Sequence, residues 1–308
     1  MKEKECRLEP LQVNAREDRD KRKALKEEVD GIIDIHNQLI LSSAPAMEAF
    51  WALNIWQDPI VLAIDSINDG ARKLKALQRN WCLYSYQLHR RAKLIQEKLP
   101  HVSAKPLIFP CSPPSSQLGS WTLLDQNQIL ASAQCSSPYL NGEVLFKEDK
   151  KGPPSRAYLK LYEALTRMRQ FPQPGEFCID AGGSPGGWAW AIQKLGARVL
   201  SVDRSSLDPK IQALPNVEYR KGDAFALQPS DFDQVDWLFS DVICYPEKLF
   251  DWVSSWVDSR KCKNFICTIK FQGTPDYGYA KKFLEIERSQ VAHLYHNKHE
   301  LTWMHTVK

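Results

Sequence analysis

The sequence predicts an α/β protein whose C-terminal half forms a doubly wound, mostly parallel sheet of seven strands. Short apolar runs alternate with helical patterns, as in parallel strands joined by right-handed helical crossovers. A glycine-rich turn follows the first of these runs. The last two runs, 290–295 and 300–307, are too close together for a crossover helix, so we expect a hairpin that adds an antiparallel strand at the edge. The other runs are 177–180, 199–202, 217–219, 237–240 and 265–269.

Residues 1–100 are expected to form a helical N-terminal region. Apolar residues from Leu25 to Leu39 recur at helical spacing and follow a charge-alternating run that begins at Asp18. The stretch 47–56 is rich in aromatic side chains, which predicts a second helix that fills a core. The stretch 71–98 is helical again by its pattern.

The third helical stretch has a basic face interleaved with aromatic side chains. Its cations could contact RNA phosphates while Trp81, Tyr84 and Tyr86 stack on bases. A solvated face above a core stripe explains the same pattern equally well. RNA binding by this region is therefore a hypothesis. The basic residues are Arg72, Lys73, Lys75, Arg79, Arg90, Arg91 and Lys93.

Residues 101–150 differ in composition from the segments on either side. Prolines and serine-rich turns surround two short strand patterns, 121–124 and 128–132. A charged segment marked by glycine and proline, 146–154, then leads into the C-terminal half. We expect 101–150 to form a small strand-containing module with a linker, followed by one domain over 151–308.

The composition is that of a globular chain in a reducing compartment. With 308 residues and 43% hydrophobic content, the chain has room for a full α/β domain and a smaller companion. Its net charge of +4 tolerates a polyanionic partner without requiring one. The eight cysteines include no Cys-x-x-Cys pair, which argues against structural zinc. The charged N-terminus has no apolar core behind it, so we expect a cytoplasmic protein without a membrane span.

The most informative stretch is 176–188, where an apolar strand reaches Asp180 and a glycine turn leads directly into a helix over 188–195. The glycine spacing matches neither the dinucleotide fingerprint nor the phosphate loop. An acid ahead of such a turn instead suits a ligand with a positively charged, amino-acid-like end. The residues expected to hold this ligand are Asp180, Gly182, Gly183, Ser184, Pro185, Gly186, Gly187 and Trp188.

Acidic residues also close the next two predicted strands. Asp203 lies about 20 residues after the glycine turn, where a carboxylate would meet a ribose diol. Asp223 follows the third strand, near the expected position of an adenine amino group. Either acid alone is more typical of a helix cap or a solvated turn. Together with Asp180, however, they favour a nucleoside-type ligand.

Five segments of this half resemble the FtsJ-like ribose 2′-O-methyltransferases. The sequence Asp-Ala-Gly-Gly-Ser-Pro-Gly-Gly-Trp of 180–188 is similar to the S-adenosylmethionine loop of that family. Residues 155–161, 240–241, 268–273 and 298–302 are similar to further family motifs, in the family's order. The resemblance implies a Rossmann-like methyltransferase fold with S-adenosylmethionine as cofactor. It also implies a catalytic tetrad of Lys160, Asp241, Lys270 and Glu300.

Within this family the chain most resembles the RlmM-type enzymes of bacterial large-subunit ribosomal RNA. The similarity includes Ser-Ser-Pro at 136–138 and Leu-Tyr-His at 294–296. Those enzymes carry a long N-terminal region with a THUMP-type RNA-binding domain, and this chain has only about half the room for it. Ribosomal RNA is the expected partner, with an mRNA cap or another RNA, such as tRNA, as alternatives.

The resemblance implies 2′-O-methylation with Lys270 as general base. A ribose hydroxyl is a weak nucleophile that must be deprotonated or steered toward the methyl group. A lysine base must be neutral, and burial beside a second cation, here Lys160, disfavours the charged form of an amine. Asp241 would orient Lys270, and Glu300 would hold Lys160 or the incoming ribose. This chemistry requires no metal.

Three histidines, His293, His296 and His299, recur at three-residue spacing before the last strand. In a hairpin they would not converge on one face, so we expect surface or RNA-facing histidines rather than a metal site. Tyr245 and Pro246 stand shortly after Asp241, where the adenine or the target base could stack. A noncatalytic RNA-binding or ribosome-assembly factor that keeps the fold is the remaining alternative, and the intact tetrad argues against it.

Overall fold

The computed structural model describes residues 9–12, 26, 28–43, 49–271 and 277–307. The chain divides into two compact units. One consists of Met1–Pro106 with Pro113–Leu145, and the other of Leu107–Ser112 with Phe146–Lys308. Across the described ranges, no helix is both long and apolar enough to cross a membrane.

The larger unit is built on a seven-stranded sheet, as the sequence predicts. The strand order is β11-β10-β9-β12-β13-β15-β14, and the first five strands in this order run parallel. The order reverses between β9 and β12, which is where open α/β sheets bind ligands. The strands are β9 (Phe177–Ala181), β10 (Arg198–Asp203), β11 (Val217–Lys221), β12 (Val235–Ser240), β13 (Cys262–Lys270), β14 (Ser289–Ala292) and β15 (Glu300–Thr306).

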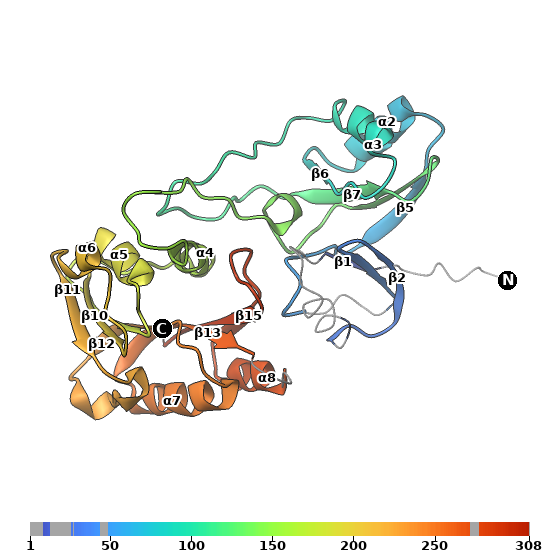
Figure 1. Cartoon of the computed structure of the whole chain (residues 1–308). Coiled ribbons are helices and arrows are strands. Elements are labelled where there is room, and N and C mark those ends of the chain that lie inside the picture. Colours follow the sequence, from blue (N-terminus) through green and yellow to red (C-terminus); the bar gives the residue numbers. More distant parts are fainter. Residues whose placement is uncertain (1–8, 13–25, 27, 44–48, 272–276, 308) are drawn as a thin grey trace. The chain divides into compact units, whose positions relative to one another are not determined.

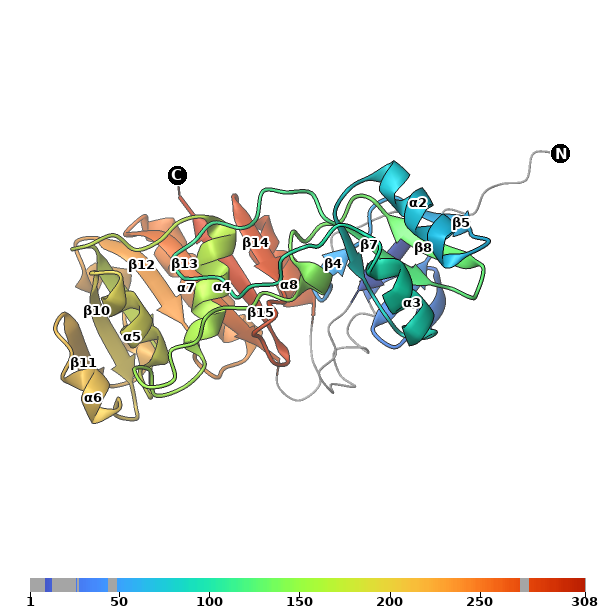
Figure 2. The same cartoon turned by 90° about the horizontal axis from the view of Figure 1, so that it is seen from above.

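Helices cover both faces of this sheet (Figures 1 and 2). α4, α5 and α6 lie on one face, and α7 and α8 lie on the other. The central strands are therefore apolar on both sides, and Ile179, Leu238 and Ile266 are fully buried. The helices are α4 (Tyr158–Met168), α5 (Gly187–Lys194), α6 (Pro209–Gln212), α7 (Pro246–Ser259) and α8 (Gly278–Glu285), with 3-10 turns at Ala224–Ala226 and Pro229–Asp231.

The expected C-terminal hairpin is present as β14 and β15, which pair antiparallel. β15 also pairs antiparallel with β13, so the antiparallel strand lies one position inside the edge and β14 forms the edge itself. Val291 and Trp303 face each other in the hairpin and are buried. This burial fixes the register, because a slip of β14 by one residue would turn Val291 away from its buried face.

The smaller unit contains two four-stranded sheets. The first has the order β2-β3-β1-β4 and the second the order β5-β8-β7-β6. The predicted strands at 121–124 and 128–132 are confirmed as β7 and β8. The elements are β1 (Glu9–Gln12), β2 (Ile32–His36), β3 (Leu39–Ser42), β4 (Asn54–Ile55), β5 (Pro59–Ala63), α2 (Ile67–Leu77), β6 (Trp81–Leu83), α3 (His89–Gln96), β7 (Gly119–Leu123), β8 (Gln128–Ser132) and a 3-10 turn at Leu140–Gly142.

The prediction of a helical region over residues 1–100 is wrong. From Ile32 onward the first expected helix is instead the β2–β3 hairpin, and Asn37 adopts a left-handed conformation with φ +57° in its turn. β-branched isoleucines suit a strand and asparagine tolerates the left-handed turn, and pairing of β2 with β3 decides against the helix that the spacing predicts. The charge-alternating run at 18–23 lies outside the described residues. The expected helix over 47–56 is also wrong: residues 47–48 lie outside the described residues, and the rest includes β4. Its aromatic residues Trp51 and Trp56 do fill a core.

The third expected helix is interrupted by a strand. α2 ends at Leu77, β6 occupies 81–83 and α3 begins at His89. Trp81 causes the break because its ring is completely buried and its Nε1 donates to the carbonyl of Leu74 at 2.9 Å. Tyr84 is buried too, so neither ring is available for stacking on RNA bases.

Candidate active site

The four residues of the expected tetrad meet in one cluster. Lys160 lies on α4, Asp241 follows β12, Lys270 ends β13 and Glu300 begins β15. Lys160 Nζ is 2.9 Å from each carboxylate oxygen of Asp241 and 3.0 Å from Glu300 Oε1. Lys270 Nζ is 3.0 Å from Asp241 Oδ1 and donates to the carbonyl oxygen of Asp241 at 2.6 Å. The predicted convergence of these residues is confirmed, whereas their individual roles stay predictions.

The sheet itself brings these groups together. Lys270 and Glu300 are directly opposite each other in the antiparallel β13–β15 pair. Asp241 leaves the carboxyl end of β12, the parallel neighbour of β13. Its backbone N–H donates to the carbonyl of Ala181 at 3.2 Å, at the end of β9 and just before the glycine turn. The tetrad therefore lies beside that turn.

The cluster is largely shielded from water, since the four side chains are between 10% and 19% exposed. Burial disfavours the charge on Lys160, but the attraction of Asp241 and Glu300 outweighs it and raises the pKa of Lys160 above its ordinary value. Burial likewise opposes the charge on Asp241, and the two lysines reverse this effect and lower its pKa. Lys160 and Asp241 are therefore held as ions.

The two lysines differ in how their donors are used. An ammonium group has three N–H donors. Lys160 has three oxygens within bonding distance, two on Asp241 and one on Glu300, so its donors are fully engaged. Among the residues that the structure describes, Lys270 has two oxygens within bonding distance, both on Asp241. One position on its nitrogen is left for another group.

Glu163 is a functional candidate that the sequence reasoning missed. It lies on α4 three residues after Lys160, and its two oxygens accept the backbone N–H groups of Tyr295 and His296 at 2.8 and 3.1 Å. Burial raises the pKa of Glu163 to about 7, although these two hydrogen bonds oppose the shift. Glu163 thus fixes the loop that leads into Glu300. An apolar helical pattern interrupted by an acid was the only signal in the sequence.

The same loop is fastened to the backbone of Glu300. His293 Nδ1 lies 3.0 Å from the Glu300 carbonyl oxygen, and the side-chain amide of Asn297 donates to that oxygen at 3.2 Å. His293 is 3% exposed, so the expectation of a surface position is wrong for this histidine. Its ring is buried because it forms a hydrogen bond with the Glu300 carbonyl, a buried backbone group. Within the described residues, no group of three or more histidine, cysteine or acidic side chains could hold a metal ion.

The glycine turn connects β9 to α5 at the predicted place. A Cβ on Gly183 would collide with the side chains of Ser201 and Asp180, so only glycine fits there. Gly186 has φ +110°, a conformation that other residues rarely adopt. Gly187 begins α5, and Trp188 Nε1 donates to the carbonyl of Ala157 at 2.9 Å, which ties the turn to the segment before Lys160. Ser184 and Pro185 lie within the turn, and Gly182 adopts φ +77°.

The three strand-end acids have distinct surroundings. Asp180 is completely buried beneath the turn, where its Oδ2 accepts from Ser201 Oγ at 3.3 Å and burial raises its pKa to about 7. Asp203 accepts the backbone N–H of Ser184 at 3.1 Å, which joins it to the glycine turn. Asp223 pairs with Arg204 at 2.7 Å, and this bond holds its pKa below the ordinary value. Asp203 is therefore the acid that directly supports the turn.

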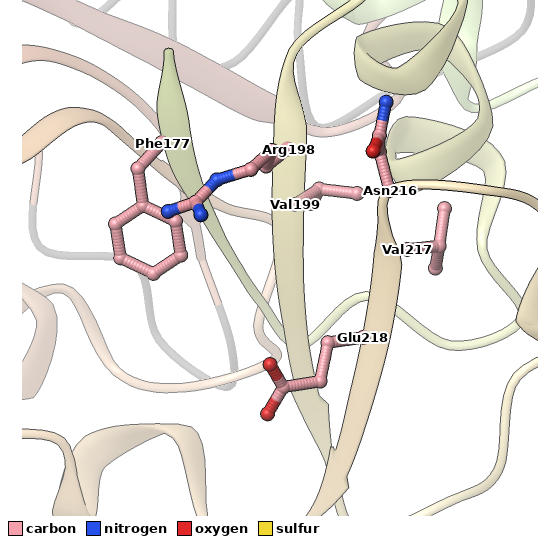
Figure 3. A pocket seen from close by; sticks show the side chains of 6 residues that line it. All are labelled: Phe177, Arg198, Val199, Asn216, Val217 and Glu218. Carbon is pink, nitrogen blue, oxygen red and sulfur yellow. The ribbon is translucent and has the colours of Figure 1, made fainter. Parts of the chain in front are cut away.

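A pocket lies at the opposite ends of the strands (Figure 3). Phe177 begins β9, Arg198 begins β10 and Val217 begins β11, and the guanidinium of Arg198 lies 5.3 Å from the Phe177 ring centre. Because the glycine turn and the tetrad are at the carboxyl ends of the strands, this pocket is separate from them. Val199, Asn216 and Glu218 complete its lining.

Residues 153–267 match the model of the FtsJ-like methyltransferase family. This range includes the glycine turn, Lys160 and Asp241. This part of the chain is thus similar to the FtsJ-like methyltransferases. The resemblance inferred from the sequence is confirmed, and S-adenosylmethionine is the cofactor of such a domain.

About half of the chain is also similar to curated enzymes called ribosomal RNA large subunit methyltransferase M. The protein from Halorhodospira halophila is 32% identical over 160 residues, which is 49% of this chain and 47% of that protein. The protein from Thauera aminoaromatica is 28% identical over 50% of this chain and 46% of its own length. The chain thus spans about half the length of these relatives. Among solved structures, a Methanococcus jannaschii fibrillarin pre-rRNA processing protein aligns with 60% of this chain and 80% of its own, at 15% identity and a TM-score of 0.37.

Proposed function

We propose that this chain methylates a ribose 2′-hydroxyl of RNA, with ribosomal RNA as the substrate. The observation that carries the proposal is the buried cluster of two lysines and two carboxylates beside the glycine turn. Burying two lysines around one carboxylate costs desolvation energy, so stability alone is a poor explanation for this cluster. Large-subunit ribosomal RNA methyltransferases among the relatives support the choice of ribosomal RNA.

Lys270 is the residue best suited to accept the hydroxyl proton. A neutral amine has two N–H donors and one lone pair. The two contacts of Lys270 with Asp241 take both donors, so the lone pair is left for the ribose hydroxyl. Lys160 cannot take this part, because three acceptor oxygens hold it as an ammonium ion. Asp241 orients both lysines, and Glu300 holds Lys160 in place.

The residues around the glycine turn fit S-adenosylmethionine. A helix N-terminus leaves backbone N–H groups without partners inside the helix, and α5 begins directly at the turn, so these groups could bind the ligand. Asp203 can accept from a ribose diol while it keeps its bond to Ser184, because a carboxylate has several acceptor positions. When bound, the cofactor supplies an electrophilic methyl group. Alignment of that group with the hydroxyl can lower the barrier by ~7 to 11 kcal/mol.

The smaller unit offers exposed cations for RNA phosphates. They lie on α2, on α3 and in the segments next to them, and a phosphate contact there would add sequence-independent affinity. Trp81 and Tyr84 lie in the core and cannot stack on bases, and Tyr86 is partly buried. The exposed cations are Arg72, Lys75, Arg79, Arg90 and Lys93.

The test is transfer of a labelled methyl group from S-adenosylmethionine to total RNA, followed by mapping of methylated riboses. We expect the wild type and Lys281→Ala, which removes an exposed lysine from α8, to transfer label to large ribosomal RNA. Lys270→Ala should lose at least ~10²-fold, as expected for a general base. Label in an mRNA cap or in tRNA would select the alternative substrates. No transfer with intact RNA binding would leave the noncatalytic factor as the remaining reading.

A further inference from the structure

Two large apolar side chains are exposed immediately after the tetrad aspartate. Ile243 is 75% exposed and Tyr245 is 63% exposed. They are two residues apart in the segment that joins β12 to α7. The sequence predicts that a base stacks at Tyr245 and Pro246. Pro246 begins α7 and is buried, so of these two residues only Tyr245 is exposed. A single exposed apolar residue needs no explanation, but two of them beside a catalytic cluster suggest a binding surface.

Two lysines, Lys248 and Lys270, lie next to this surface. Cys244 stands between the two exposed residues; burial raises its pKa to about 11, and Lys248 and Lys270 act in the opposite direction. Lys270 Nζ donates to the backbone carbonyl of Asp241, two residues before Ile243. Lys248 is exposed, and its Nζ lies 4.3 Å from the centre of the Phe225 ring, which holds the side chain near the start of α7.

The glycine turn borders the same segment on its other side. A Cβ on Gly182 would collide with Val242, so the turn and the segment after Asp241 are in direct contact. A group resting on Tyr245 would thus be close to both the cofactor site and Lys270. An apolar, aromatic surface flanked by cations is complementary to a nucleotide, whose base is planar and whose phosphate is negative.

We propose that Ile243 and Tyr245 form a platform for the base of the target nucleotide, which must be unpaired, while Lys248 contacts a neighbouring phosphate. This inference rests on the proposed function and names the form of RNA that the site accepts. A base in a duplex is stacked between its neighbours and cannot lie flat on a protein side chain. An unpaired nucleotide in a loop or bulge can turn its base onto the ring of Tyr245.

The first experiment measures methyl transfer to total RNA by Tyr245→Ala, Tyr245→Phe and Val307→Ala. Val307 is a matched control because it is apolar and 42% exposed. We expect Tyr245→Ala to raise the KM for RNA roughly 5- to 100-fold, the effect of losing one base–aromatic stack. Tyr245→Phe should stay close to wild type, and calorimetry should give all variants the same affinity for S-adenosylmethionine. An unchanged KM, or a loss confined to cofactor affinity, overturns the platform.

The second experiment separates this inference from the proposed function. Fluorescence anisotropy follows binding of a mixed-sequence single-stranded RNA oligonucleotide and of the same strand annealed to its complement. We expect the wild type to bind the single strand more tightly and Tyr245→Ala to lose that preference. If the preference survives in Tyr245→Ala, the platform is refuted. A wild type that binds in this way but transfers no methyl group refutes the proposed function alone.

Discussion

Replacing Glu163 by glutamine should raise stability and lower activity in the same protein. The ionised carboxylate accepts two backbone N–H groups of the loop before Glu300. Glutamine has one acceptor oxygen and would point its NH2 group at the other N–H. The loop must then shift, and with it Glu300 and the ammonium group of Lys160. A displacement of about 1 Å at a catalytic group can lower the rate ~10²-fold.

The effect on stability follows from the pKa of Glu163. Burial raises it from an ordinary value of 4.5 to about 7 in the folded protein. A carboxyl whose folded pKa is raised binds its proton more tightly in the folded state, so its contribution to stability declines as the pH rises from 4.5 through 7. Glutamine does not titrate. Relative to wild type, Glu163→Gln should therefore gain roughly 2 to 3 kcal/mol in unfolding free energy between pH 5 and pH 8.

The assays are urea denaturation at pH 5 and pH 8, and methyl transfer to RNA at pH 8. We expect similar stability of Glu163→Gln and wild type at pH 5, greater stability of the variant at pH 8, and a kcat reduced ~10- to 100-fold with unchanged cofactor affinity. Glu97→Gln is the matched control, because the Glu97 side chain is 56% exposed and pairs with Lys93 only at 4.0 Å. Equal loss of stability at both pH values, or full activity at pH 8, would refute the reasoning.

Three further predictions concern the tetrad and the strand-end acids. Lys160→Ala leaves the partly buried Asp241 and Glu300 without their shared cation, so urea denaturation should show that the unfolding free energy falls by ~3 to 5 kcal/mol. The exposed control Lys281→Ala should lose less than ~0.5 kcal/mol, and similar values for both variants would contradict the charge balance of the cluster. Asp203→Ala should weaken S-adenosylmethionine binding in calorimetry far more than Glu300→Ala, because Asp203 supports the glycine turn through Ser184, and equal losses would argue against a ribose contact. Burial raises the pKa of Asp180 from 3.8 to about 7, so the wild type should lose unfolding free energy between pH 4 and pH 7. Asp180→Asn should remove on the order of 4 kcal/mol of that decline. If the unfolding free energies of wild type and variant changed in parallel with pH, Asp180 would not be buried in its charged form.

Local sequence patterns were sufficient for the larger unit. Each parallel strand is a short apolar run bounded by turn residues, and both faces of the central strands are buried, so the pattern persists whatever the neighbours are. The glycine turn is also marked locally in the sequence, although the side chains that require glycine at Gly183 and Gly186 include Ser201 and Ile211, which lie further along the chain. The four tetrad residues were reached through the family resemblance, because no periodicity distinguishes Lys160 from any other lysine on a helix.

Local patterns failed in the smaller unit, where strand pairing competes with helical spacing. The apolar residues around Ile32 suit either structure, and pairing of β2 with β3 decided for the strand. Trp81 likewise lies in strand β6 rather than in the helix that its neighbours' pattern predicts. Its side chain is buried in the core and donates a hydrogen bond to the carbonyl of Leu74.

The sequence by itself determined the parallel sheet and the position of the glycine turn, because these depend on residues close together in the chain, and the family resemblance supplied the candidates for the tetrad. Only the tertiary structure decided which of the two lysines has all three of its N–H donors engaged. That decision depends on acceptor oxygens contributed by Asp241 and Glu300, and the contact of Lys160 with Glu300 joins residues 140 positions apart. The same is true of Glu163, whose bonds to the loop before Glu300 span 132 and 133 residues. Hydrogen bonds of this range leave no periodic trace in the sequence, since each requires only one suitable side chain at each end.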